Sequence, residues 1–195
     1  MNKQPIALFP LFADRQESIL KHLALLVSSL DEHVKADVSQ VFHDPERLFG
    51  AVMQKGDDRK YAGISLLFPF LIAKYIEPEI DPDTAASVAA AIMCFISALD
   101  LLDDIEEEKH TALLDKLGLA RVLNISTALL ALAQRSILTL PSQSVASEQR
   151  VVLLAFMQDA IIKRQVDQDF YLSSKQKLSG DMKYPTENTF KRASR

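Results

Sequence analysis

The sequence predicts an all-α protein that folds as one helical bundle. Only 5 of its 195 residues are glycine and 8 are proline, too few for a β-rich fold with many turns. Alanine, leucine and isoleucine dominate, and they favour helices or are tolerated in packed helical cores. Long apolar segments are joined by short polar connections, as in a bundle. We expect one domain over residues 1–195, with a polar, basic tail over residues 173–195 whose composition allows flexibility.

Three helices are predicted in the first part of the chain. Residues 14–30 carry apolar side chains at helical spacing. Residues 45–54 follow Asp44, a suitable N-cap, and begin with proline, which is common at the first helical position. Residues 61–76 form an apolar helix that we expect Pro69 to bend.

The central helix is predicted over residues 83–108, after a rigid connection at residues 77–83. Its first part is apolar almost all round, which is typical of a helix buried on most sides. Three more helices follow, each bounded by a residue that caps or ends a helix. They are residues 111–117, ended by Gly118; residues 120–138, stopped by Pro141; and a helix that Ser144 or Ser147 caps and that ends near residue 172.

The composition also limits the compartment and the chemistry. A net charge of -4 gives no electrostatic reason to bind nucleic acid. The single cysteine, Cys94, excludes an intrachain disulfide and a multi-cysteine metal site. Residues 6–12 are too short for a signal peptide, and no run reaches the ~18–20 apolar residues of a membrane span. The longest candidate, residues 85–102, carries Asp100, so we expect a cytoplasmic protein without a transmembrane segment.

Four acidic residues near the end of the central helix form what we call the acidic stripe. Asp100, Asp103, Asp104 and Glu107 stand at i, i+3, i+4 and i+7, which places them on one helix face. Carboxylates at this spacing repel one another, and the dipole at a helix C-terminus disfavours them further. A divalent cation would relieve both penalties, and Mg²⁺ prefers oxygen ligands. The stripe therefore predicts a magnesium site.

Two interpretations of this helix stay open. The face below the acids is apolar through Ile96, Met93 and Ala89, which suits a pocket with a metal-bound diphosphate at its mouth and an apolar tail inside. An amphipathic helix with a solvated acidic face produces the same pattern, since an apolar arc lies on the opposite side. That arc consists of Leu99, Leu101, Leu102 and Ile105.

Three segments resemble the trans-prenyl diphosphate synthases, class I isoprenoid synthases with an all-α fold. Residues 103–107, DDIEE, resemble the first aspartate-rich motif DDxxD, in a bacterial branch in which the motif reads LLDDI, as at residues 101–105. Residues 121–133 are similar to the helix that follows in that family. Residues 164–169, RQVDQD, resemble its GQxxD segment, and the resemblance covers roughly residues 45–195.

The resemblance implies an isoprenoid-synthase-type helical bundle and a Mg²⁺-dependent prenyltransferase. Its reaction would condense an allylic diphosphate with isopentenyl diphosphate inside a dry, shaped cavity. By position, Asp103 and Asp104 would be catalytic and would hold magnesium together with Glu107, with Asp100 as a helper. We also expect a homodimer.

The resemblance also implies a set of substrate-binding residues. They are Lys55, Arg59 and Lys60 near a degenerate GKxxRP segment, Gln165 and Asp169, and Ala98 and Leu99 at the floor of the tail pocket. Because Ala98 is small and one helical turn adds ~5.4 Å of depth, a completed enzyme is expected to make a product longer than the C15 farnesyl chain.

The chain also departs from the family pattern. The second aspartate-rich motif is missing, and the paired arginines expected after the first motif are replaced by Lys109 and His110 alone. We therefore expect a fragment or a truncated relative of these enzymes. In either case the bundle would be incomplete and inactive as it stands. Two alternatives stay open: a non-catalytic helical protein that pairs with a second chain through exposed apolar surface, and a prenyltransferase that modifies a peptide.

Overall fold

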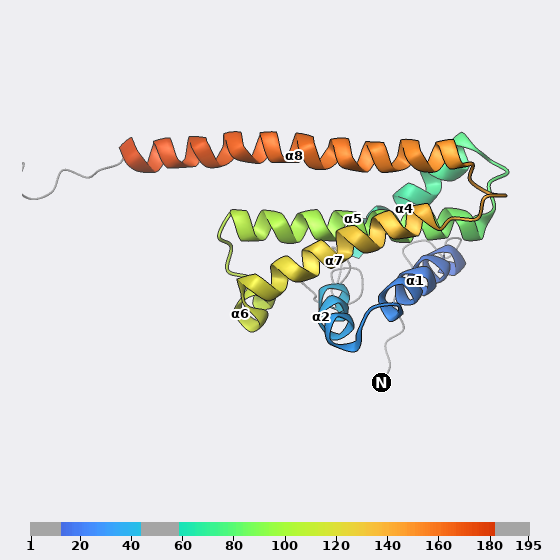
Figure 1. The fold of residues 1–195 in the computed structure, drawn as a ribbon, viewed down its shortest axis with the longest axis horizontal. Coiled ribbons are helices and arrows are strands. Elements are labelled where there is room, and N and C mark those ends of the chain that lie inside the picture. Colours follow the sequence, from blue (N-terminus) through green and yellow to red (C-terminus); the bar gives the residue numbers. More distant parts are fainter. Residues whose placement is uncertain (1–12, 44–58, 182–195) are drawn as a thin grey trace, which may run out of the picture. The chain divides into compact units, whose positions relative to one another are not determined.

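The computed structural model describes residues 13–43 and 59–181, and every regular element in these ranges is a helix (Figure 1). The prediction of an all-α fold is confirmed. The chain divides into two compact units, residues 1–155 and 156–195. The boundary between them falls within the last helix, α8 (Ser147–Asp181).

Helices α1 (Ala13–Ser28) and α2 (Glu32–His43) begin the first unit. Helix α1 matches the prediction for residues 14–30 closely. Helix α2 was not predicted, because its buried apolar residues are the valines Val38 and Val41, and β-branched residues are weak helix formers. Its first turn is supported by Asp31, whose Oδ1 accepts a hydrogen bond of 3.1 Å from the backbone N–H of His33.

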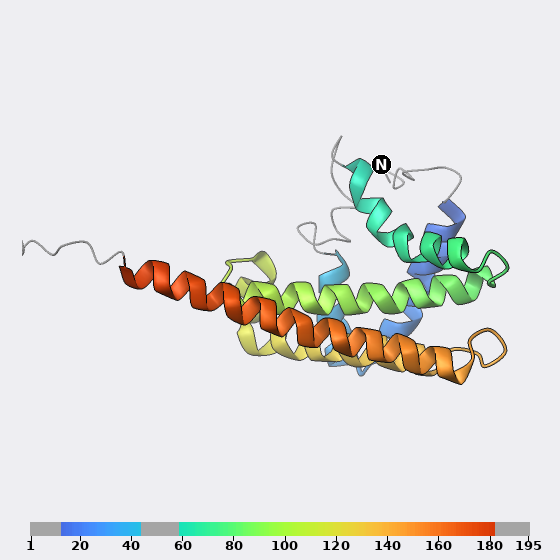
Figure 2. The same cartoon turned by 90° about the horizontal axis from the view of Figure 1, so that it is seen from above.

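Helix α4 (Arg59–Ile76) contains Pro69 in its interior, as predicted. Figure 2 shows α4 changing direction along its length, which an internal proline explains because it removes a backbone hydrogen bond. The predicted helix at residues 45–54 lies outside the described residues, and so does Lys55.

Helix α5 (Pro82–Glu106) is the core of the first unit, and α1, α4 and α7 all pack against it. Its N-cap is Asp81, whose Oδ2 accepts hydrogen bonds from the backbone N–H and the hydroxyl of Thr84, at 2.9 and 2.8 Å. Burial along most of its length is confirmed, and burial raises the pKa of the Cys94 thiol to about 12. By length and composition alone α5 could cross a membrane, but most of its apolar window is buried, as is usual for a core helix.

Helices α6 (Ala112–Leu117) and α7 (Leu119–Leu138) follow the acidic end of α5. Gly118 ends α6 with φ 77°, a conformation that favours glycine, so the predicted stop is confirmed. Helix α7 lies alongside α5 (Figures 1 and 2). The buried Ser126 hydroxyl of α7 donates a hydrogen bond of 2.9 Å to the carbonyl of Ala98 in α5.

Helix α8 continues to Asp181, so the prediction that it ends near residue 172 is wrong. The segment after Ser174 contains Lys175, Gln176, Lys177 and Leu178, which are good helix formers and extend the helix despite their polarity. The rest of the predicted tail, residues 182–195, lies outside the described residues.

Candidate functional site

The acidic stripe lies at the C-terminal end of α5. Asp100, Asp103 and Asp104 stand on its last two turns, and Glu107 is its C-cap. Asp104 is only 5% exposed, and the other three are half-buried. A carboxylate as buried as Asp104 requires a compensating partner, because an unpaired charge is costly away from water.

One compensating partner is Lys109, which the backbone brings back over the last turn. Glu108 adopts a left-handed conformation with φ 55°, so the chain reverses there. Its N–H donates to the carbonyl of Ile105 at 3.2 Å, and the N–H of Lys109 donates to the carbonyl of Asp104 at 2.9 Å. These two bonds form a Schellman motif, in which the left-handed position is usually glycine and is Glu108 here.

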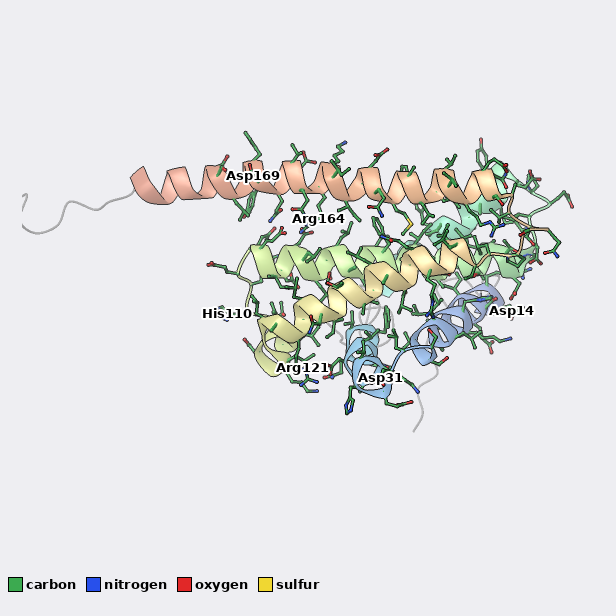
Figure 3. All side chains as sticks on the ribbon, in the orientation of Figure 1. Asp14, Asp31, His110, Arg121, Arg164 and Asp169 are labelled. Atoms are coloured by element: carbon green, nitrogen blue, oxygen red, sulfur yellow. The ribbon has the colours of Figure 1, made fainter. Side chains whose placement is uncertain are left out.

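The Lys109 ammonium joins two members of the acidic stripe. Its Nζ lies 3.3 Å from Oδ1 of Asp104 and 3.1 Å from Oε2 of Glu107. Hydrogen bonds from the ammonium raise the pKa of Lys109, and the bond to Glu107 has a larger effect than the bond to Asp104. The other base near the motif, His110, is 94% exposed and projects away from the helix end (Figure 3). A tethered cation therefore already neutralises part of the predicted metal site.

The donor chemistry of the stripe fits magnesium, although Lys109 now holds two of the carboxylates. Asp103, Asp104 and Glu107 offer only oxygen ligands, which Mg²⁺ prefers. Within residues 13–43 and 59–181, no group of three or more His, Cys, Asp or Glu side chains is arranged to hold a metal ion. Metal binding would therefore require Lys109 to leave Asp104 and Glu107.

The expected floor of the tail pocket lies directly against α7. Ala98 is fully buried, and its carbonyl accepts the hydrogen bond from Ser126. Leu99 is partly exposed. Of the bulky residues near this level, Phe95 is buried and Phe68 is 57% exposed. On the side of Ala98, a tail pocket would thus need α7 to move away from α5.

The remaining predicted substrate residues stand on other helices than the stripe. Arg59 and Lys60 begin α4, and their side chains are outside the described part of the structure. Gln165 and Asp169 are exposed residues of α8 in the second unit. Figure 3 shows Asp169 and Arg164 projecting from different sides of that helix.

Two features of the first unit were not predicted from the sequence. Arg121 of α7 forms a bidentate ion pair with Asp37 of α2, with Nε–Oδ2 and Nη2–Oδ1 distances of 3.0 and 2.5 Å. This pair ties α2 to α7, and its two members are 84 positions apart, so no local pattern could reveal it.

The second feature is a cavity of about 800 Å³ that we call the acidic cavity. Its apolar lining includes Val88, Val145 and Val152. Four carboxylates line it as well, and the described lining residues include no Lys, Arg or His; the acids are Glu77, Glu79, Asp81 and Glu148. Three of these acids stand in the polar connection before α5, which was interpreted only as a linker.

Comparisons with known proteins add no family to these observations. No protein-family model matches the chain, and no curated protein and no solved structure matches it.

Proposed function

We propose that this chain is a prenyl-diphosphate-synthase-like protein whose acidic stripe binds Mg²⁺ together with the diphosphate of an allylic substrate. The observation that supports this proposal is the Lys109 ammonium, held at 3.3 Å from Asp104 and 3.1 Å from Glu107. The stripe already attracts a cation to the place where a metal is expected. We further propose a cytoplasmic protein that is inactive in prenyl transfer without a second acidic motif.

In this proposal the residues of the stripe and Lys109 have separate roles. Asp103, Asp104 and Glu107 supply carboxylate oxygens at a fixed helix end. Lys109 leaves them when the site fills, and its ammonium then donates hydrogen bonds to diphosphate oxygens, for which lysine is well suited as a point charge. Magnesium, when bound, would neutralise the diphosphate leaving group of the allylic substrate. In a completed enzyme the bond between the allylic carbon and the diphosphate would break, the double bond of isopentenyl diphosphate would form a new bond to that carbon, and a proton would be lost.

Calorimetric titration with Mg²⁺ in the presence of methylenediphosphonate tests the proposal. Wild type should bind the metal and the diphosphonate together, whereas Asp103→Ala/Asp104→Ala should lose the signal. The matched control is Asp14→Ala/Glu17→Ala, which removes two exposed carboxylates of α1 and the same formal charge. Equal binding by wild type and the stripe variant would overturn the proposed site.

A second candidate function is a non-catalytic interaction protein, which the exposed face of α4 favours. Phe68, Leu71, Ile72 and Tyr75 are 57%, 38%, 41% and 88% exposed and stand at i, i+3, i+4 and i+7. A contiguous apolar face of this kind commonly marks an interface. The titration separates the two candidates, because an interaction protein should show no diphosphonate-dependent Mg²⁺ binding and should associate with a partner whether or not the metal is present.

A further inference from the structure

The acidic cavity is a site that the proposed magnesium chemistry does not use. Its described lining residues all belong to the first unit, residues 1–155. They come from the end of α4, the connection before α5, α5 itself, the connection before α8 and the first turns of α8. Figures 1 and 2 show both connections at the end of α5 where that helix begins. A volume of about 800 Å³ is typical of a small-molecule site, for which about 300–1,000 Å³ is usual.

The walls of the acidic cavity are largely hydrocarbon. Val88, Val145 and Val152 line it together with Ile80 and Leu153. Val145 is buried and Val152 is 66% exposed, so the apolar wall extends from the interior to the surface. Apolar walls with a few polar groups are typical of pockets that bind organic molecules. A well-matched occupant therefore offers hydrocarbon as well as charge.

The charge of the lining selects a cation. The ionisable side chains of the described lining are four exposed carboxylates, without a Lys, Arg or His among them. The carboxylates belong to Glu77, Glu79, Asp81 and Glu148. Arg150, which follows the lining residue Gln149, donates instead to the carbonyl of Leu138 and the hydroxyl of Ser142, at 3.0 and 2.8 Å. The lining therefore attracts positive charge.

Lys74 of α4 shows that the connection before α5 can hold an alkylammonium group. Its Nζ donates hydrogen bonds to the carbonyls of Pro78 and Ile80, at 2.8 and 2.6 Å. Hydrogen bonds from Thr84 have the largest effect in lowering the pKa of Asp81, and the charge of Lys74 lowers that pKa further. Lys74 offsets one of the four carboxylate charges, so an acidic excess of three remains at the cavity.

The four carboxylates are not gathered around one point. Within the described ranges, no group of three or more His, Cys, Asp or Glu side chains is arranged to hold a metal ion. Three of the acids stand in the connection before α5, and Glu148 stands in the first turn of α8. A single exposed ion pair contributes little, so a ligand gains affinity by reaching several of these acids at once. An extended cation meets this requirement better than a compact one.

We propose that the acidic cavity binds a linear polyamine, a methylene chain that carries several ammonium groups. The ammonium groups pair with the exposed glutamates, and the methylene groups pack on the valines. The stem of a lysine packs on apolar surface in the same way while its charged head stays in water. A metal ion has no hydrocarbon for these walls, and a monoamine reaches fewer of the carboxylates. The proposal is independent of the magnesium site, because the acidic stripe is not part of the described lining.

Calorimetric titration of the full chain with spermidine, without Mg²⁺ and at about 50 mM salt, tests the proposal. Wild type should bind with a dissociation constant of about 100 µM or lower. Glu77→Gln/Glu79→Gln removes two exposed carboxylates with little change in shape and should weaken binding at least about tenfold. The matched control is Asp14→Asn/Glu17→Gln, which removes the same formal charge from exposed positions of α1 and should bind like wild type.

Hexaamminecobalt(III) separates a shaped site from simple charge attraction. It carries the same triple charge as spermidine in a compact form without hydrocarbon, so it should bind wild type at least about tenfold more weakly. Equal affinity for the two cations would overturn the proposal, and so would a control variant that binds spermidine as weakly as the cavity variant. In either case the net charge of the chain alone would account for the binding.

The ¹H–¹⁵N spectrum of the same protein locates the polyamine. Spermidine should shift the amide resonances of residues 77–81 and 143–149 most strongly. Shifts centred on residues 100–107 would place the polyamine at the acidic stripe and overturn the proposal, and so would a wild-type chain that does not bind spermidine below about 1 mM. The titration with Mg²⁺ and methylenediphosphonate is a separate experiment, so failure of the polyamine site and failure of the magnesium site are distinguishable.

Discussion

Replacing Lys109 with methionine removes the ammonium from the acidic stripe and keeps the length of the side chain. At 3.1 and 3.3 Å, and with an effective dielectric constant of about 20, each contact contributes a gross attraction of about 5 kcal/mol. Desolvation of Asp104 and the rotamer entropy of lysine, up to about 2 kcal/mol, oppose this attraction. Lys109 is also 47% exposed, so solvent screens much of the rest. We expect Lys109→Met to lower the free energy of unfolding by about 1–2 kcal/mol at pH 7.

The assay is urea denaturation followed by circular dichroism, at several pH values. Because the pKa of Lys109 is raised in the folded protein, its contribution is fully present below the ordinary value of 10.5 and is lost as the pH rises through the folded-state pKa. The difference between wild type and Lys109→Met should therefore shrink above pH 10.5. Lys116→Met, which removes an exposed lysine of α6, is the control and should change stability little. A variant as stable as wild type at pH 7 would refute the role of Lys109 as counter-ion.

Three further substitutions test the helix ends and the α5–α7 contact. Glu108→Gly should raise the free energy of unfolding by roughly 0.5–1 kcal/mol, because glycine adopts the φ of 55° without strain; an unchanged melting temperature would count against it. Ser126→Ala should lower the free energy of unfolding by about 1 kcal/mol, since it leaves the buried carbonyl of Ala98 without its donor; urea denaturation with no loss would contradict this. Hydrogen bonds from Thr84 lower the pKa of Asp81, so Asp81→Ala should lower the free energy of unfolding at pH 7. The difference in stability between wild type and variant should fade as the pH drops below 3.8, and a difference that persists at low pH would contradict this prediction.

The central part of the fold follows from local sequence patterns. The apolar run of α5 predicts its burial, and the boundaries of α6 follow from Thr111 and Gly118 because caps act over only a few residues. Helix α2 was missed because its apolar pattern rests on β-branched valines, and packing on neighbouring helices helps to stabilise it. The end of α8 was placed too early because polarity was taken as a sign of a loop, although lysine and glutamine are good helix formers.

The acidic stripe was predictable, but the ion pairs around it were not. Helical spacing alone places Asp103, Asp104 and Glu107 together. The return of Lys109 depends on a left-handed conformation at Glu108, and glutamate gives no sequence signal for that conformation. The contact of Ala98 with Ser126 joins residues 28 positions apart and depends on how α7 packs against α5. Tertiary packing thus decides how much room the stripe leaves for a ligand.

The central claim, that the end of α5 binds a divalent cation with diphosphate, is tested most directly by locating the ion. Paramagnetic Mn²⁺ added with methylenediphosphonate broadens the amide resonances of residues near it, and Mg²⁺ should reverse the effect by competition. We predict that broadening in the ¹H–¹⁵N spectrum is strongest at residues 103–109 and disappears in Asp103→Ala/Asp104→Ala. Broadening centred instead on Glu77, Glu79 and Asp81 of the acidic cavity, or unchanged in that variant, would contradict the claim.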